Sequence, residues 1–497
     1  MSIKPEKIIY VCFMIVFAAL TNSVSAVQLH NWREPLFLIA AEMERTESSP
    51  SGMFWDDIRT ADIFDRTIWP EKEILDSNYF FLEPSATGAF GPVAEDKDDD
   101  FYWKIGMLNQ IRYRNLLIRQ TLDVDKRYQY DSLYPAHRER DVRGRIGEAF
   151  LQVDWKYGFF RLGRLNRNWG PFADRSLVLS SNPYSYDALE WQLHSSLFEF
   201  RHLFAPFHYE RRNHRDTDDN SNVNRFFTAH SLNLMLGKWV TLGITESVLF
   251  TRKSDFPDLQ YINPFSIYTV VNTNQEGKGN LMLSFQWNIH PLTEDISFRG
   301  QVAFDDFQVD DEVASDKEPT HWGLDMGLFW RNPFSITFPH LLKAQYNYRS
   351  PWLYTVTDNN ANNGERYIYW GKSLGFQQND GDRVSGGFSI AGDNYWAAEV
   401  ELAFCREGGR DVLTRWNDNE TGNTRGLPSD SSYTTQKAFE FNLKSIVYFK
   451  DYADLALKGS SMWVKNRDNI KGSDFEFIPS IQAELSIHFS DFKLRLP

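Results

Sequence analysis

Hydrophobic and polar residues alternate along much of this chain, in segments of about ten residues. Side chains of a β-strand point alternately to its two faces, and a tilted strand of roughly ten residues crosses the hydrocarbon core of a membrane. The pattern therefore predicts many antiparallel strands with one apolar and one polar face. The clearest apolar faces are Leu281, Leu283, Phe285, Trp287 and Ile289; Ile296, Phe298, Val302 and Phe304; Trp396, Ala398, Val400, Leu402 and Phe404; and Phe439, Phe441, Leu443 and Val447. The intervening polar positions include Gln286, Arg299, Gln301, Glu399, Glu401, Glu440 and Lys444.

Two architectures fit this alternation. In a sandwich the polar faces meet solvent and the apolar faces form a narrow core, whereas in a transmembrane barrel the polar faces line a wet lumen and the apolar faces meet lipid. The connections favour the barrel, because short turns at one end and long loops at the other are typical of outer-membrane proteins. We predict short turns at Gly237-Lys238, Lys156-Tyr157-Gly158 and Asp380-Gly381, and long loops over residues 211–224, 310–320 and 417–432. At about 25 residues per strand and connection, the chain accommodates roughly 16 to 18 strands.

The chain ends on a further alternating segment, in which Ile481, Ala483, Leu485, Ile487 and Phe489 share one face. This segment resembles the terminal assembly signal of outer-membrane barrels. Residues 490–497 follow it, so two endings stay open: a short tail extends beyond the barrel, or residues 492–496 close it.

The first residues have the pattern of a secretory signal peptide. Lys4 and Lys7 precede an apolar stretch over residues 8–20, and small residues follow at Val24-Ser25-Ala26, so we expect cleavage after Ala26. A retained membrane anchor is the alternative. Residues 27–100 include helix-like spacing over 32–44 and 53–74, which predicts a partly helical plug or periplasmic element, with an irregular first pair of strands as the other interpretation. The barrel would then occupy residues 101–497.

Composition and charge narrow the class of protein. The chain has 39 Phe, 22 Tyr and 16 Trp, yet its mean hydropathy is −0.48 and no segment after the leader is apolar enough for a transmembrane helix. Barrels have this composition because only one face of each strand meets lipid, with aromatic girdles at both interfaces. The net charge of −14 makes nucleic acid an improbable partner. Cleavage would leave Cys405 as the only thiol, so no intramolecular disulfide is expected.

The best candidate for a binding site lies in residues 160–180, where a strand rich in arginine ends in Trp169-Gly170-Pro171. Arg161 and Arg164 are placed to face a lumen and pair with carboxylates, and Trp169 offers a flat face on which a sugar ring can stack. The polysaccharide-binding candidates are Arg161, Arg164, Arg167, Trp169 and Arg175. The competing interpretation is a salt-bridged barrel wall with an interfacial tryptophan.

Several ordered motifs together resemble the capsule assembly Wzi family. They run from about Gly163 to Gly381 and comprise the Gly-Arg and Trp-Gly-Pro segment, residues 224–230, 243–246, 261–264, 305–310, 346–354 and 371–382. The resemblance implies an outer-membrane barrel of about 18 strands with a small periplasmic helical element, which helps to hold or organise surface polysaccharide. Its implied partners are that polysaccharide, outer-membrane lipid and the barrel assembly machinery, for a chain that acts as a monomer without a cofactor.

Metal binding and catalysis find little support in the sequence. Asp305 and Asp306 with residues 310–312 form an acidic cluster that is typical of a solvated loop, and residues 358–363 lack the glycine that a calcium loop requires. His194 and Ser195 are adjacent, so on a strand they point to opposite faces and the histidine cannot readily activate the serine.

The leading hypothesis is therefore a non-enzymatic protein of the cell outer membrane that aids assembly or attachment of capsular or other surface polysaccharide. A general or substrate-selective porin is the alternative, because polar strand faces and barrel size suffice for a channel. An outer-membrane lipid or glycan hydrolase is a third, weaker class.

Overall fold

The computed structural model describes residues 53, 78–91, 101–131, 133–134, 143–207, 223–274, 279–306, 320–356, 364–392, 396–414, 434–449, 452–472, 474–489 and 492–495. In chain order the elements are β1 (Tyr79–Phe90), β2 (Phe101–Tyr113), β3 (Leu116–Asp125), η2 (Lys126–Gln129), β4 (Gly144–Trp155), β5 (Gly158–Leu165), β6 (Tyr186–His194), β7 (Phe198–Phe207), β8 (Asn224–Leu236), β9 (Val240–Arg252), α5 (Leu259–Ile262), α6 (Tyr268–Asn274), β10 (Gly279–Ile289), β11 (Ile296–Asp306), β12 (His321–Arg331), β13 (His340–Arg349), β14 (Ile368–Tyr369), β15 (Lys372–Ser373), β16 (Gly381–Gly392), β17 (Trp396–Glu407), β18 (Gln436–Phe449), β19 (Ala453–Lys465), η3 (Arg467–Asn469), β20 (Glu476–His488) and β21 (Phe492–Arg495).

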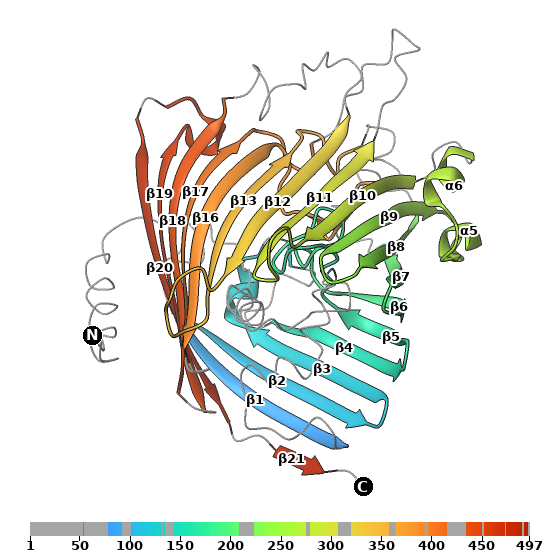
Figure 1. The fold of residues 1–497 in the computed structure, drawn as a ribbon, viewed down its shortest axis with the longest axis horizontal. Coiled ribbons are helices and arrows are strands. Elements are labelled where there is room, and N and C mark those ends of the chain that lie inside the picture. Colours follow the sequence, from blue (N-terminus) through green and yellow to red (C-terminus); the bar gives the residue numbers. More distant parts are fainter. Residues whose placement is uncertain are drawn as a thin grey trace.

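The long strands form a closed antiparallel barrel of 18 strands within the described residues (Figure 1). Consecutive strands pair in register around the ring, and β14 and β15 form a separate small hairpin. Closure is made by the last strand, which is interrupted: residues 483–488 of β20 pair with residues 85–90 of β1, and β21 pairs with residues 79–82. Of the two predicted endings the second is found, because residues 492–495 pair with β1 and help the terminal alternating segment to close the barrel; they do not form a tail beyond it.

The burial pattern distinguishes the barrel from a sandwich. On β17, Leu402 is 61% exposed, whereas Glu399 on the other face is 2% exposed. On β10, Phe285 is 45% exposed and Gln286 only 2%. A sandwich would bury the apolar faces, so this inversion places them against lipid and the polar faces inside the ring. Among the described residues, no helix has the length and apolar character needed to cross a membrane.

The connections differ between the two ends of the barrel, as the sequence predicts. Gly237 and Lys238 lie in the turn between β8 and β9, and Lys156 and Tyr157 join β4 to β5. Longer connections follow β5, β7, β9, β11, β13 and β17 at the opposite end, and we call this end the long-loop end. The predicted loops over 211–224, 310–320 and 417–432 fall between strands at this end, but nearly all their residues lie outside the described ones.

Two sequence-based boundaries are wrong. Asp380-Gly381 is not a short turn, because Gly381 begins β16 at the end of the long connection over residues 350–380. The barrel also begins before residue 101, because β1 lies within the segment 27–100 that we predicted to be partly helical. An apolar–polar alternation that is interrupted by Pro84 hides this strand in the sequence. The predicted leader (1–26) and the helix-like stretches at 32–44 and 54–74 lie outside the described residues.

Candidate functional site

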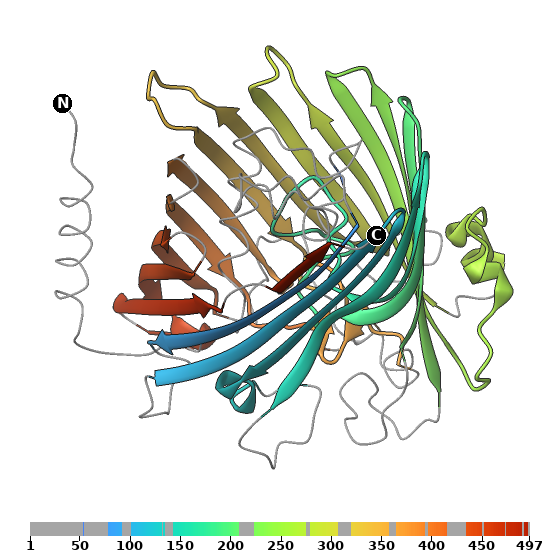
Figure 2. The ribbon, with the colours of Figure 1, turned by 90° about the horizontal axis from the view of Figure 1, so that it is seen from below.

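Two long connections fold into the ring of strands and fill part of it, and together we call them the plug. The first covers residues 166–185 between β5 and β6, and the second covers the described residues 350–356 and 364–380 between β13 and β16 and carries the β14–β15 hairpin. Figure 2 shows the first of them in the middle of the ring. The plug shares a buried core with inward residues of β6 to β11 and with Val412, which follows β17. The core is formed by Trp169, Leu177, Val178, Leu179, Tyr186, Ala188, Leu203, Ala205, Phe207, Phe227, Ala229, Leu249, Met282, Ala303, Leu353, Tyr354, Tyr367, Ile368, Leu374 and Val412.

The two plug segments are bonded to each other. The Ser180 amide donates to the Leu374 carbonyl (2.8 Å), and the Tyr354 hydroxyl donates to the Leu177 carbonyl (2.8 Å). They approach closely at Gly375, where a Cβ would lie 2.3 Å from the Leu177 carbonyl oxygen. The plug is therefore one packed unit rather than two independent loops.

Buried wall residues hold this unit in place. The Gln301 side-chain oxygen of β11 accepts the Leu177 amide (2.8 Å), and Asp305 of the same strand accepts the Tyr354 amide (2.6 Å). Arg225 of β8 is 3% exposed. Its guanidinium donates to the carbonyl oxygens of residues 364, 366 and 368 at 2.7, 2.9 and 2.9 Å. Because the carbonyl groups of a buried loop need hydrogen-bond donors, these three bonds from the Arg225 guanidinium hold the plug backbone against the wall.

Three of the predicted site residues lie inside this packed region. Arg161 and Arg167 are fully buried and both contact Glu190 of β6, at 3.4 and 3.2 Å. Arg201 of β7, which the sequence analysis did not single out, contacts the same carboxylate at 3.4 Å. Trp169 is fully buried, so its ring offers no exposed face. The arrangement is a buried cluster of three arginines around one glutamate.

Arg164 and Arg175 lie elsewhere. Arg164 pairs with Asp187 at 2.6 Å, with side-chain exposures of 34% and 59%, on the outer face of the barrel. It does not share the lumen with Arg161, because positions three apart on a strand point to opposite faces. Arg175 belongs to the plug and binds Asp325 of β12 through two nitrogens, at 2.6 and 3.2 Å. Burial opposes its charge, but Asp174 and Asp325 together raise the pKa of the guanidinium.

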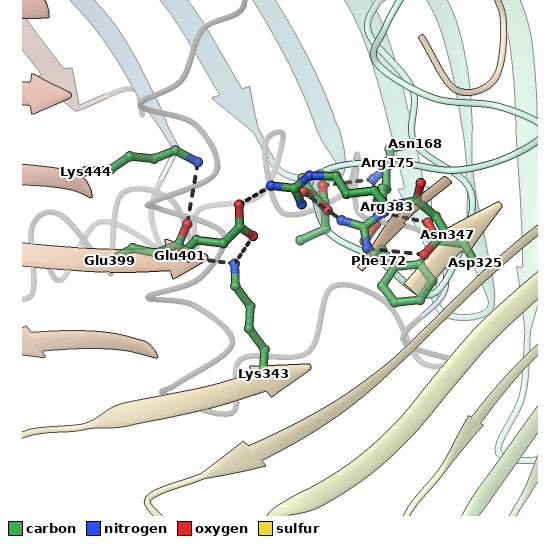
Figure 3. Close-up of polar contacts among 12 residues, drawn as sticks. Asn168, Phe172, Arg175, Asp325, Lys343, Asn347, Arg383, Glu399, Glu401 and Lys444 are labelled. Carbon is green, nitrogen blue, oxygen red and sulfur yellow. Dashed lines mark hydrogen bonds and ion pairs between the residues drawn. The ribbon is translucent and has the colours of Figure 1, made fainter. Parts of the chain in front are cut away.

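A run of alternating charges continues from Arg175 along the neighbouring wall (Figure 3). Arg383 of β16 contacts Glu401 of β17 at 2.6 Å, and Lys343 of β13 contacts Glu401 and Glu399 at 3.8 and 2.7 Å. Lys444 of β18 reaches Glu399 at 3.5 Å. We call these five residues the charge ladder. The side chains of Arg383 and Lys444 are 22% and 20% exposed, so this wall is less covered than the one beneath the plug core.

A second cluster lies at the long-loop end, where η2, the end of the first plug segment and the β14–β15 hairpin meet. Tyr128 stacks on Tyr134 (4.7 Å between ring centroids), and Tyr134 contacts Tyr184 edge-on (5.9 Å). Lys372 places its Nζ 4.3 Å from the Tyr184 ring centroid and 3.4 Å from Asp131. The guanidinium of Arg145 lies 4.0 Å from the same ring centroid. We call Tyr128, Asp131, Tyr134, Arg145, Tyr184 and Lys372 the tyrosine cluster.

The electrostatics of the tyrosine cluster keep its phenols neutral. Burial and then Asp131 raise the pKa of Tyr184, and burial with Asp123 and Asp125 raises the pKa of Tyr128. Burial lowers the pKa of Lys372, an effect that Asp131 opposes. Neutral aromatic rings beside cations are a combination that suits sugar rings and acidic sugar substituents.

Sequence reasoning missed this cluster and the second plug segment as a unit. Lys372 is 188 positions from Tyr184 (372 − 184), and no local spacing links the second plug segment to the rest of the cluster. The two-residue turn of the hairpin has positive φ at Trp370 and Gly371 (52° and 73°), and of the two only the glycine is a residue type that favours such a turn.

The other candidate sites have local structural roles. The Ser195 hydroxyl accepts the amides of Leu197 and Phe198 in a strand turn, at 3.1 and 3.2 Å. Asp305 binds the plug, and residues 310–312 and 358–363 lie outside the described ones. Within the part of the chain that the structure describes, no cluster of His, Cys, Asp and Glu has the arrangement of a metal site.

No protein-family model and no curated protein matches the chain. Among solved structures, Wzi from Escherichia coli is similar with a TM-score of 0.54 and 12% identity, over 94% of this chain and 95% of that chain. Wzi is described as an outer-membrane protein involved in group 1 capsule assembly and as a carbohydrate-binding β-barrel. Two other structures are more weakly similar. OccAB4 from Acinetobacter baumannii has a TM-score of 0.44 and 9% identity, over 84% of this chain and 98% of that chain. OpdK from Pseudomonas aeruginosa has a TM-score of 0.45 and 8% identity, over 84% of this chain and 100% of that chain.

These likenesses concern the fold. Together with the outward apolar faces and the closed ring, the similarity in fold to Wzi identifies the chain as an outer-membrane β-barrel.

Proposed function

We propose that this protein binds surface polysaccharide at the long-loop end and helps to assemble or retain it, without enzymatic activity. The observation that carries the proposal is the plug, which occupies part of the lumen with a packed apolar core and presents the tyrosine cluster at its outer end. Such a core narrows the path that is left for free diffusion through the barrel. The similarity in fold to a carbohydrate-binding barrel supports the same interpretation.

The tyrosine cluster has the chemistry for sugars. Its aromatic faces suit the apolar side of a sugar ring, and Arg145 and Lys372 supply cations for carboxylated or otherwise acidic sugars. Binding by Arg161, Arg164, Arg167, Trp169 and Arg175 stays a prediction. In this structure the three fully buried ones among them stabilise the plug and the wall, so any contribution they make to binding acts through that support.

A glycan array with the purified protein tests the site. The double variant Tyr184→Ala/Lys372→Ala should lose binding of acidic polysaccharide, while Arg467→Ala, which removes one cation at the same end of the barrel, should retain it. In cells, deletion should release cell-bound polysaccharide, and the wild-type chain but not the double variant should restore it. Unchanged retention in the deletion strain contradicts the proposal.

A channel function is the second candidate, favoured by the partly exposed side chains of the charge ladder. Planar-bilayer recordings distinguish the two. A steady open conductance supports the channel, and a closed barrel that binds glycan supports polysaccharide assembly.

A further inference from the structure

The outer wall of the barrel carries a group of polar residues in the middle of three adjacent strands. His202 of β7 pairs in register with His230 of β8, and His230 pairs with Glu246 of β9. Thr228 lies two positions from His230. We call these four residues the polar patch. They point outward, because the alternate positions Arg201 and Ala229 lie on the lumen side of the same strands.

Such a patch is costly on a lipid-facing wall. A charged side chain at the middle of the hydrocarbon belt destabilises a barrel, an acid less than a base. The neighbouring outward positions are apolar and exposed, among them Leu232, Leu234 and Ile244 at 36%, 42% and 39%. Glu246 is nevertheless only 6% exposed and His202 only 2%. Another part of the chain must therefore cover the patch.

The cover is the connection between β9 and β10, which leaves the long-loop end and folds back over the outside of the wall. Figure 2 shows α5 and α6 outside the ring of strands. We call residues 256–274 the flap. Its Thr269 hydroxyl donates to Glu246 Oε1 (2.6 Å), and the Tyr268 amide donates to Glu246 Oε2 (3.0 Å).

The flap and the wall share a second apolar core on the outside of the barrel. It consists of Phe226, Val248, Phe250, Tyr261 and Tyr268, with Phe204, Val271 and Leu281 packed against it. The Tyr268 ring also lies 4.4 Å from the His230 ring, and its hydroxyl is 2.9 Å from the Thr228 hydroxyl. The polar side of the flap is therefore matched to the polar patch.

The other side of the flap is apolar and uncovered. Its exposed side chains are Phe256 (63%), Leu259 (63%), Phe265 (78%), Ile267 (60%) and Val270 (52%). Phe265 stacks on Phe200 of β7 at 6.2 Å between ring centroids. Phe200 pairs in register with the exposed Leu232, so the apolar side of the flap continues the lipid-facing surface of the wall.

We propose that the flap lies within the outer leaflet of the membrane, where its apolar side chains contact lipid acyl chains and its polar side shields the patch. The continuity with the lipid-facing wall identifies the occupant as lipid, because five large apolar side chains in water would be an exposed patch of the kind that soluble surfaces avoid. The origin of the flap at the long-loop end identifies the leaflet. This inference is independent of glycan binding.

Spin labels in bilayers of phospholipid test the position of the flap. Phe265→Cys is made in a Cys405→Ser background, since Cys405 is the one free thiol of the described residues. The controls are Leu234→Cys on the outward face of β8 and Lys238→Cys in a strand turn, where the lysine side chain is 64% exposed. The spin label at residue 265 should be as accessible to the two relaxing agents as the label at residue 234. Molecular oxygen should relax it several-fold more than a water-soluble nickel complex does. A label at 265 that behaves like the label at 238 overturns the proposal.

A second pair of variants tests the shielding. Thr269→Val removes the hydrogen bond from the Thr269 hydroxyl to Glu246 and leaves those from the Tyr268 and Thr269 amides, whereas Thr273→Val removes only a local bond to the Thr269 carbonyl within α6. With the label at 265, Thr269→Val should raise access to the nickel complex several-fold and Thr273→Val should not. Equal access in the two variants, in protein that retains its folded barrel on gels, overturns the role of the Thr269 hydroxyl bond to Glu246 in holding the flap.

Discussion

Replacing Arg225 with methionine should release the plug from the wall of the barrel. Methionine fills similar space but donates no hydrogen bond, so the carbonyl groups of residues 364, 366 and 368 lose the donor that they share. A hydrogen bond to a charged group contributes about 1.5–3 kcal/mol, and bonds that share one side chain do not add fully, so we expect a local loss of about 4 kcal/mol. At about 1.4 kcal/mol per factor of ten, the open state of this segment becomes roughly a thousandfold more populated.

Hydrogen exchange measures this opening directly. The Leu374 amide donates to the Tyr367 carbonyl (3.1 Å), so a peptide covering residues 364–374 should exchange much faster in Arg225→Met, with Arg225→Lys in between. Arg164→Met is the matched control, because its ion pair with Asp187 is exposed and outside the barrel. Unchanged exchange at residues 364–374 in a folded Arg225→Met barrel would refute the assignment of Arg225 as the anchor.

Three further predictions concern the same region. Gly375→Ala places a Cβ 2.3 Å from the Leu177 carbonyl oxygen, so it should separate the plug segments and raise bilayer conductance, and unaltered conductance would contradict the close packing. Glu190→Gln leaves three buried arginines without their shared carboxylate, so the free energy of unfolding in urea should fall by about 3–5 kcal/mol. The control Glu294→Gln removes an exposed ion pair with Lys238 and should change this free energy by less than about 1 kcal/mol. Burial raises the pKa of Glu365 to about 7 from its ordinary 4.5, so the folded protein favours the protonated carboxyl group. The free energy of unfolding should therefore be highest below pH 4.5 and fall by up to about 3 kcal/mol as the pH rises through 7. The urea midpoint of Glu365→Gln should not show this pH dependence.

The barrel was predictable because its determinants are local. Each strand carries its own alternation, and the difference between short turns and long connections can be counted along the sequence. What alternation leaves open is which face is buried. That question depends on the surroundings of the whole sheet, and the exposed Leu402 beside the buried Glu399 answers it only in the folded structure.

The plug was not predictable, because its stability depends on contacts between distant segments. Trp169 and Tyr367 belong to one core, yet neither lies in a periodic segment that reveals its partner. The strand β1 was missed for a different reason. Pro84 and small residues interrupt its pattern, and pairing with β2 and β20 supplies the order that the local sequence lacks.

For the candidate site, the sequence predicted which types of residue interact, but not which of these residues lie together in the structure. Arginines beside carboxylates were expected, and Arg161 and Arg164 both have acidic partners. Strand periodicity already implies that residues three apart face opposite sides, so Arg164 belongs with the outer surface. The convergence of Arg161, Arg167 and Arg201 on Glu190 brings together β5, the first plug segment, β7 and β6, which one sequence does not reveal.

The two sides of the lumen suggest how one barrel can be both firmly plugged and polar inside. The plug packs its apolar residues against β6 to β11, so that this side of the interior behaves like the core of a soluble protein. Across from it, the charge ladder satisfies its acids and bases within the wall and keeps part of their surface open. The main anchors of the plug are on β8 and β11, and not on β17 and β18, which carry part of the charge ladder. Loosening the plug should therefore first widen the side of the lumen that the charge ladder lines. A conductance that rises when Arg225 is replaced should therefore depend on Arg383 and Lys444, and charge reversal at those positions should change its ion selectivity more than its size.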